Sequence, residues 1–171
     1  MAVKDAVEDF SDEETLGYGI DGCSAPNFIM SLTGLAKSMA KIATASDAKS
    51  GAMNDAALRV RRSMYAHPHL VVGNGRACTK LMGLLPDETI VKTGAEAVFV
   101  AAIPSLKLGV ALKVLDGNSR GSEVAITQIL VELGLLDPVS PEVQALLNPD
   151  ITNWHGIITG TVGPAQDRLL A

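Results

Sequence analysis

The stretch TIVKTGAEAVFVAAIPSLKLGVALKVLDG, residues 89–117, decides the fold that we predict for this chain. Its first part is rich in Val, Ile and Phe, and the run from Leu108 to Leu115 is similarly apolar, as is typical of strands. Pro104 to Lys107 lies between the two runs and is a short loop of the kind that joins antiparallel neighbours. The stretch therefore predicts a hairpin of two paired strands.

Lys92 is the exceptional residue of this hairpin, because it stands near the start of an otherwise apolar first strand. Partial removal from water beside Val91 favours the neutral amine, which can take a proton from a hydroxyl nucleophile. Lys92-Thr93-Gly94 is also the K-T-G element that serine β-lactamases and penicillin-binding proteins place beside the active-site cleft. The alternative is an edge-strand lysine that prevents aggregation, and Gly94 then forms a bulge instead of approaching a ligand.

Composition predicts one globular domain over residues 1–171, because 47% of the residues are hydrophobic and can build a core. A net charge of −5 without a long basic run argues against nucleic acid or an anionic membrane as partner. No apolar run approaches the length of a membrane span. Two cysteines form no disulfide framework, so we expect a reducing, cytoplasmic location. The dense basic group Arg59, Arg61 and Arg62 is expected to form a solvated helix face.

Helices account for most of the remaining chain. Apolar spacings of three and four predict a helix from Asn27 to Ala43, with Pro26 in its first turn, on the stripe Phe28, Leu32, Leu35, Met39 and Ile42. A second stripe, formed by Met53, Ala57, Val60 and Met64, predicts a helix that ends before Pro68.

Shorter helices are predicted at 78–85, 120–133 and 141–147, and a last edge strand at 157–162. Residues 1–16 are predicted to be an acidic lead-in without an apolar stripe, 70–75 a short strand or turn, and 161–171 a loose tail. The predicted class is α+β, an antiparallel sheet packed with helices.

Several residues are candidates for catalysis or metal binding. Cys23 follows three closely spaced glycines, and a helix beginning at Pro26 would stabilise its thiolate, although a buried inert thiol is the alternative. His67 and His69 share a face if their segment is extended, but a third ligand at metal spacing is missing. The S-x-x-K matches at 38–41 and 46–49 are interpreted as chance, the first on the solvent face of a helix and the second in a polar loop.

Five blocks in order along the chain together resemble the inducible rhizobial type of L-asparaginase, asparaginase II: GYGIDGCSAPNF at 17–28, AHPHLVVGNGRACTKLM at 66–82, VKTGAEAVFVAAIP at 91–104, LGVALKVLDGNSRGSEVA at 108–125 and NPDITNWHGIITG at 148–160. The resemblance covers residues 17–160 and only the family's second half. It implies a fold similar to serine β-lactamases and glutaminases, hydrolysis of L-asparagine to L-aspartate and ammonia, and pairing of copies as dimers.

The same resemblance implies roles for individual residues. Lys92 matches the lysine of the second of two serine and lysine pairs, and Thr93, Gly94 and Glu96 line the substrate site. Cys23 matches one ligand of a nearby zinc, and Asp21, its neighbour, also lines the substrate site. Ala97 stands where a glycine is usual, which is expected to stiffen the strand slightly.

Both family serines and the C-x-x-K with the other zinc ligands belong to the first half of the family. We therefore expect a C-terminal portion that lacks the nucleophilic serines and does not hold zinc tightly. The alternative is a non-catalytic oligomeric or small-ligand-binding remnant of the same fold.

Overall fold

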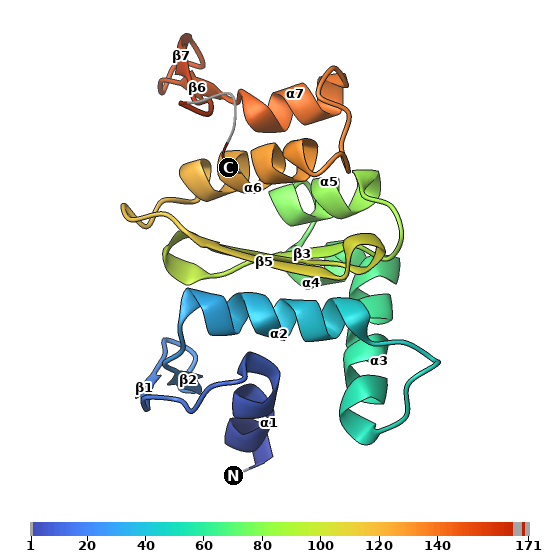
Figure 1. Cartoon of the computed structure of the whole chain (residues 1–171). Helices are drawn as coiled ribbons and strands as arrows, with labels where there is room; N and C mark the ends of the chain where they lie inside the picture. The colour runs from blue at the N-terminus through green and yellow to red at the C-terminus, as the bar shows by residue number, and fades with distance from the viewer. Residues whose placement is uncertain (1, 166–168, 170–171) are drawn as a thin grey trace. The chain divides into compact units, whose positions relative to one another are not determined.

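The computed structural model describes residues 2–165 and 169, which form helices, short strands and connecting loops (Figure 1). The chain divides into two compact units. Unit 1 contains the chain up to His67 together with residues 87–90 and 100–111, and unit 2 contains residues 68–86, 91–99 and the chain from Leu112 onward. None of the helices in the described residues combines the length and the apolar character needed to cross a lipid bilayer.

The predicted sheet exists and has three strands: β3 (Ile90–Thr93), β4 (Val98–Ile103) and β5 (Leu108–Lys113), in that order. Short connections join each strand to the next, and only antiparallel neighbours can be joined so briefly. Pro104–Leu106 forms a single 3₁₀ turn, η2, which ends on Lys107 in the left-handed region with a φ of 52°. The turn predicted at this place is confirmed.

The prediction of one continuous first strand was wrong. The chain leaves β3 at Gly94 and passes through a 3₁₀ turn, η1 (Ala95–Ala97), before β4 begins. Glu96 and Ala97 have positive φ angles of 55° and 57°, which no strand accommodates. Ala97 therefore does not stiffen a strand. It occupies a left-handed position that favours glycine.

Unit 1 begins with α1 (Ala2–Ser11), followed by the hairpin of β1 (Tyr18–Ile20) and β2 (Pro26–Phe28), then α2 (Leu32–Thr44) and α3 (Ala52–Ala66). α1 packs against α2. Phe10 of α1 lies against a buried cluster made by Ala45, Ala57 and Leu58. Residues 2–11 therefore contribute apolar packing, which the acidic composition did not predict.

The start of α2 differs from the prediction. Ser31 is the N-cap, and its hydroxyl accepts a hydrogen bond from the Gly34 amide at 2.8 Å. Pro26–Phe28 is extended, with Ile20 opposite Pro26 and Tyr18 opposite Phe28 in the β1–β2 ladder. A serine side chain can accept a hydrogen bond from a free amide in the first turn of a helix, whereas a proline side chain cannot. The helix therefore begins after Ser31 and not at Pro26.

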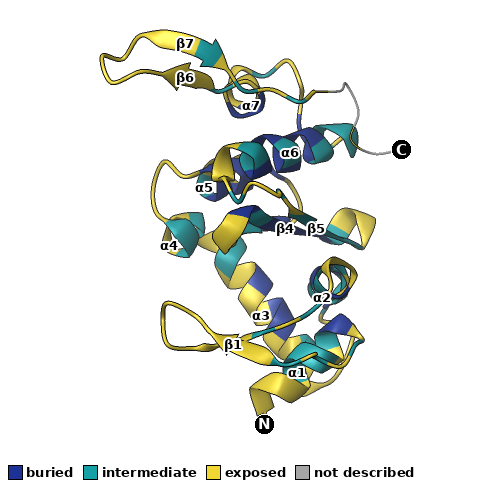
Figure 2. Ribbon diagram, turned by 90° about the vertical axis from the view of Figure 1, so that its left-hand side faces the viewer, coloured by how far each residue is buried: buried dark blue, intermediate teal, exposed yellow. Residues whose placement is uncertain are grey.

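Unit 2 contains α4 (Pro68–Val72), α5 (Ala77–Leu84), α6 (Ser119–Glu132) and α7 (Pro141–Leu147). The expected strand at 70–75 is wrong, because α4 extends to Val72, whereas residues 74 and 75 form a turn. The helices predicted at 78–85 and 141–147 are confirmed: Cys78, Leu81 and Met82 of α5 are buried, and α7 follows the Ser140 cap. Figure 2 shows the buried positions of α6 and the exposed hairpin of β6 (Asp150–Thr152) and β7 (Ile158–Thr161). The predicted last strand is thus present, and the predicted tail lies partly outside the described residues.

Candidate functional site

Lys92 lies in β3 and is half-buried. Its ammonium donates a hydrogen bond to the backbone oxygen of Thr93 at 2.5 Å. The Thr93 amide donates in turn to the Cys78 sulfur of α5 at 3.3 Å. The K-T-G segment is therefore held at the end of its strand by a helix that comes earlier in the chain.

Cys78 contacts this segment, and the sequence did not predict that contact. The residue is 1% exposed. Burial raises the pKa of the Cys78 thiol, while the Thr93 amide and the positive charge of Lys92 act in the opposite direction. The thiol consequently stays protonated and serves as packing and as a hydrogen-bond acceptor. The helical spacing of Cys78 predicted burial, but no local pattern could show that it meets β3.

Hydrogen bonds to two strands, β4 and β5, hold the turn that follows Lys92. The Gly94 amide donates to the Val98 oxygen at 2.7 Å. The Lys113 ammonium at the end of β5 donates to the Glu96 backbone oxygen. A Cβ on Gly117 would lie 2.7 Å from a Glu96 carboxylate oxygen, so this glycine leaves room for the glutamate. Gly94 and Glu96 are exposed, and the turn presents them to solvent beside the half-buried lysine.

Asp21 and Cys23 lie in unit 1, in the exposed turn between β1 and β2. One Asp21 carboxylate oxygen accepts hydrogen bonds from the Cys23 amide at 2.8 Å and from the Ala25 amide at 3.0 Å. The carboxylate thus builds the turn. The prediction that a helix N-terminus points at Cys23 was wrong, because α2 begins only at Leu32.

A metal centre is not evident from the described ranges, residues 2–165 and 169. They contain no group of three or more His, Cys, Asp or Glu side chains that could hold a metal ion. The expected extended segment at His67 and His69 was wrong, because α4 begins between them at Pro68. Cys23 and Asp21 offer two donors, whereas zinc takes three or four protein ligands, so these residues do not make a zinc site by themselves.

The two S-x-x-K segments do not present a free serine and lysine pair. The Ser38 hydroxyl donates to the Gly34 oxygen at 3.0 Å, and Lys41 forms an ion pair with Asp12 at 2.6 Å. Ser38 is half-buried, so its expected place on the solvent face was wrong. Lys49, the lysine of the second match, is exposed and follows the end of α2 in a loop.

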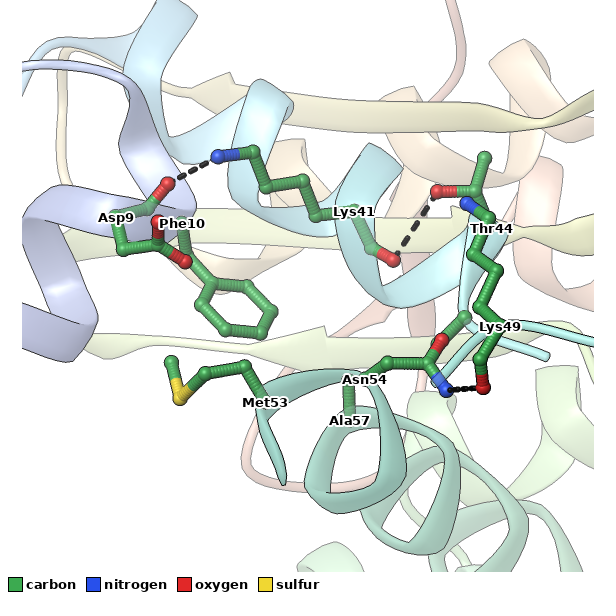
Figure 3. A pocket seen from close by; sticks show the side chains of 9 residues that line it. Asp9, Phe10, Lys41, Thr44, Lys49, Met53, Asn54 and Ala57 are labelled. Atoms are coloured by element: carbon green, nitrogen blue, oxygen red, sulfur yellow. Dashed lines mark hydrogen bonds between the residues drawn. The ribbon is translucent and has the colours of Figure 1, made fainter. Parts of the chain in front are cut away.

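Two concave surfaces in unit 1 are lined by residues other than the site residues predicted from the sequence. A hollow of about 280 Å³ lies between α1, α2 and α3. Figure 3 shows the side chains that line it. Lys41 reaches the Asp9 backbone oxygen across it, and Asn54 donates to the Lys49 backbone oxygen. A neighbouring groove of about 610 Å³ is almost wholly apolar and shares Phe10, Met53 and Ala57 with this hollow.

Arg61 was expected on a solvated face and is 5% exposed. Its Nη1 donates to the backbone oxygens of Ile42, Ala43 and Ala45 at 2.7, 3.1 and 2.9 Å. Its Nη2 forms an ion pair with Glu88 at 2.9 Å. An arginine can be buried when its N–H donors have acceptors. Here the end of α2 supplies three acceptor oxygens.

Comparison with known proteins identifies one family. Residues 1–164 match the family described as L-asparaginase II. The match includes the first 16 residues, which lie outside the blocks of the resemblance noted above. No curated protein matches the chain. Because the family match spans almost all of the 171 residues, the chain belongs to the L-asparaginase II family.

Proposed function

We propose that this chain carries the Lys92 side of an active site that hydrolyses L-asparagine to L-aspartate and ammonia. The observation that carries the proposal is the position of Lys92, half-buried at the end of β3 and next to the exposed Gly94. The family match supports the reaction class, an asparaginase-like amide hydrolysis. The fold would be of the serine β-lactamase and glutaminase type.

The chemistry requires proton transfer at two points. A hydroxyl nucleophile must lose its proton as it attacks the side-chain amide carbon, and the leaving nitrogen must gain one as the C–N bond breaks. Water then hydrolyses the ester and restores the hydroxyl. We assign both transfers to the Lys92 amine. Thr93, Gly94 and Glu96, which follow it in the chain, are with Asp21 the proposed lining of the substrate site.

The nucleophile is proposed to come from residues outside these 171. Ser38 has no free lysine base, since Lys41 is bound to Asp12, and Ser46 lies in the loop after α2 with no helix to present its hydroxyl. Under this proposal the purified chain does not release ammonia at a measurable rate above the background. Turnover that disappears in Ser38→Ala would place the nucleophile inside the chain and contradict the proposal.

Lys92→Met tests the lysine in an enzyme completed with the family's first half. Methionine has a similar length and no amine, so we expect activity to be lost and stability to stay equal or to rise, because an apolar group replaces a half-buried polar one. Ammonia release and urea unfolding are measured on the same samples. Lys80→Met is the matched control, since Lys80 is exposed on α5 in the same unit. Retained activity with a clearly lowered stability would show that Lys92 is structural.

A second candidate is a non-catalytic protein that binds asparagine. The missing serine and lysine pair in the described residues favours it. Calorimetric binding of L-asparagine without ammonia release, even after addition of the family's first half, would support this candidate over hydrolysis.

Zinc and self-association remain proposals. Cys23 would be one zinc ligand beside Asp21, and further ligands would have to come from other residues. We expect the chain alone to bind zinc weakly and to pair as a homodimer. Metal analysis after dialysis and light scattering measure these two properties. Stoichiometric zinc that is lost on His67→Ala would show that the histidines take part in a site.

A further inference from the structure

A third hollow in unit 1 combines several cationic side chains. Its volume is about 380 Å³, within the roughly 300–1,000 Å³ of small-molecule sites. It is formed by the end of α2, the loop that follows, α3 and the turn between β4 and β5. The lining residues are Ala43, Thr44, Ala45, Ser46, Lys49, Arg61, Pro104 and Lys107. Three are cations and none is acidic. We propose that this basic hollow binds a compact anion with two negative charges, a phosphate group or a dicarboxylate.

Two of the cations are available to a ligand. Lys49 and Lys107 are exposed, and within residues 2–165 neither ammonium forms an ion pair with a carboxylate. They come from separate segments, the loop after α2 and the left-handed end of η2. Figure 3 shows the Lys49 side chain extending towards Thr44, which also lines the hollow. An anion between these lysines would meet positive charge from two directions.

Arg61 offsets the partial negative charge at the end of α2, which would otherwise repel an anion. The C-terminal end of a helix carries partial negative charge on its free carbonyl oxygens. Arg61 donates to three such oxygens at the end of α2, and Glu88 balances the guanidinium charge. Asp47, on the loop, is paired with Arg62 at 2.6 Å. The charge of the hollow is therefore set by Lys49 and Lys107.

The loop that carries Lys49 is held in place before any ligand binds. Asn54 donates to the backbone oxygens of Ser46 and Lys49, both at 3.0 Å, and accepts from the Ser46 amide at 3.1 Å. The Lys49 amide also donates to the Ser46 oxygen at 3.1 Å. Binding would then order little backbone, which reduces its entropic cost. The Thr44 hydroxyl donates to the Lys41 backbone oxygen at 3.2 Å, so the Ser46 hydroxyl is the lining group that offers a hydrogen bond independent of side-chain charge.

Calorimetry with inorganic phosphate and with succinate tests the proposal on the purified chain at low ionic strength. We expect saturable binding of at least one of the two, at one site per chain. Lys49→Gln and Lys107→Gln should each weaken it about tenfold, ~1.4 kcal/mol, and Lys49→Arg should restore it. Lys80→Gln on α5 removes the same charge from unit 2 and should leave the affinity unchanged. Circular dichroism confirms that each variant is folded.

The outcomes separate the ligand classes and the proposal itself. Phosphate binding without succinate binding assigns the hollow to phosphorylated ligands, and the reverse assigns it to dicarboxylates. Absence of binding by both probes overturns the proposal. Binding that persists unchanged in both glutamine variants, or that falls equally in Lys80→Gln, also overturns it. None of these results depends on whether the chain hydrolyses asparagine.

Discussion

Replacing Arg61 by methionine is the sharpest test of the packing in unit 1. The arginine side chain is 6% exposed, and its guanidinium serves three backbone oxygens and the Glu88 carboxylate. Methionine keeps an apolar stem of comparable length but removes every donor. The variant therefore isolates the hydrogen bonds and the charge from the volume of the side chain.

The expected loss can be estimated from these partners. A buried acceptor left without a donor costs about 1–3 kcal/mol, and water at the helix end will satisfy part of the three oxygens. The Glu88 side chain is 35% exposed, so its charge regains some hydration. We expect the free energy of unfolding to fall by about 3–5 kcal/mol, as for other buried pairs from which one partner is removed.

Urea unfolding followed by circular dichroism at pH 7 measures this change, with Arg62→Met as the matched control. Arg62 is the next residue of α3, and its side chain is 48% exposed although it binds Asp47 and Glu88. Exposed ion pairs contribute about 0–1 kcal/mol, so the control should change little. A loss below about 0.5 kcal/mol for Arg61→Met, the scale of a surface substitution, would refute the buried role.

Four further predictions concern individual side chains. Thr89 is fully buried with a hydroxyl that has no partner among the described residues, so Thr89→Val should stabilise the chain by about 1 kcal/mol in urea unfolding. A Cβ on Gly109 would lie 2.0 Å from the Ala36 backbone oxygen, so Gly109→Ala should destabilise by about 1–3 kcal/mol or more, as a lowered melting temperature will show. In a thiol reagent assay, exposed Cys23 should react rapidly and Cys78 only after unfolding. Because the pKa of the Cys78 thiol is raised in the folded chain, its contribution to stability is intact below the usual thiol pKa and declines as the pH rises above it.

Each of these predictions has a contrary outcome. A destabilising Thr89→Val would mean that the hydroxyl has a partner, and Thr89→Ser serves as the control that keeps the hydroxyl. A fully stable Gly109→Ala would show that β5 is not packed closely on α2. Rapid reaction of both thiols in the native chain would show that Cys78 is accessible, and stability that is flat across alkaline pH would contradict its raised pKa.

Much of the local structure could be predicted from the sequence. The helical spacing of Cys78, Leu81 and Met82 placed all three on the buried face of α5. Ser140 and Pro141 marked the beginning of α7, and the turn at 104–107 was confirmed. These features depend on residues a few positions apart, where periodicity, capping and turn chemistry act without help from the rest of the chain.

The candidate site was predictable only in part. Lys92 was correctly expected on a strand of the sheet. Its contact through Thr93 with Cys78 joins residues far apart in sequence, and no periodicity signals such a contact. Cys23 was expected at a helix N-terminus, but it lies in a hairpin turn that the Asp21 carboxylate builds. The wrong expectation followed from apolar spacing that continued back to Phe28, where strand pairing with Tyr18 took precedence.

The amino-acid sequence by itself determined the α+β class, the positions of most helices and the family to which the chain belongs. Only the tertiary structure decided which polar groups are buried. Arg61 illustrates the difference, because its three-residue basic cluster is typical of a solvated surface. Its burial depends on the carbonyl oxygens at the end of α2 and on Glu88, which come from other segments. A buried charge is stable only when partners meet it in space, and local sequence does not specify where distant segments meet.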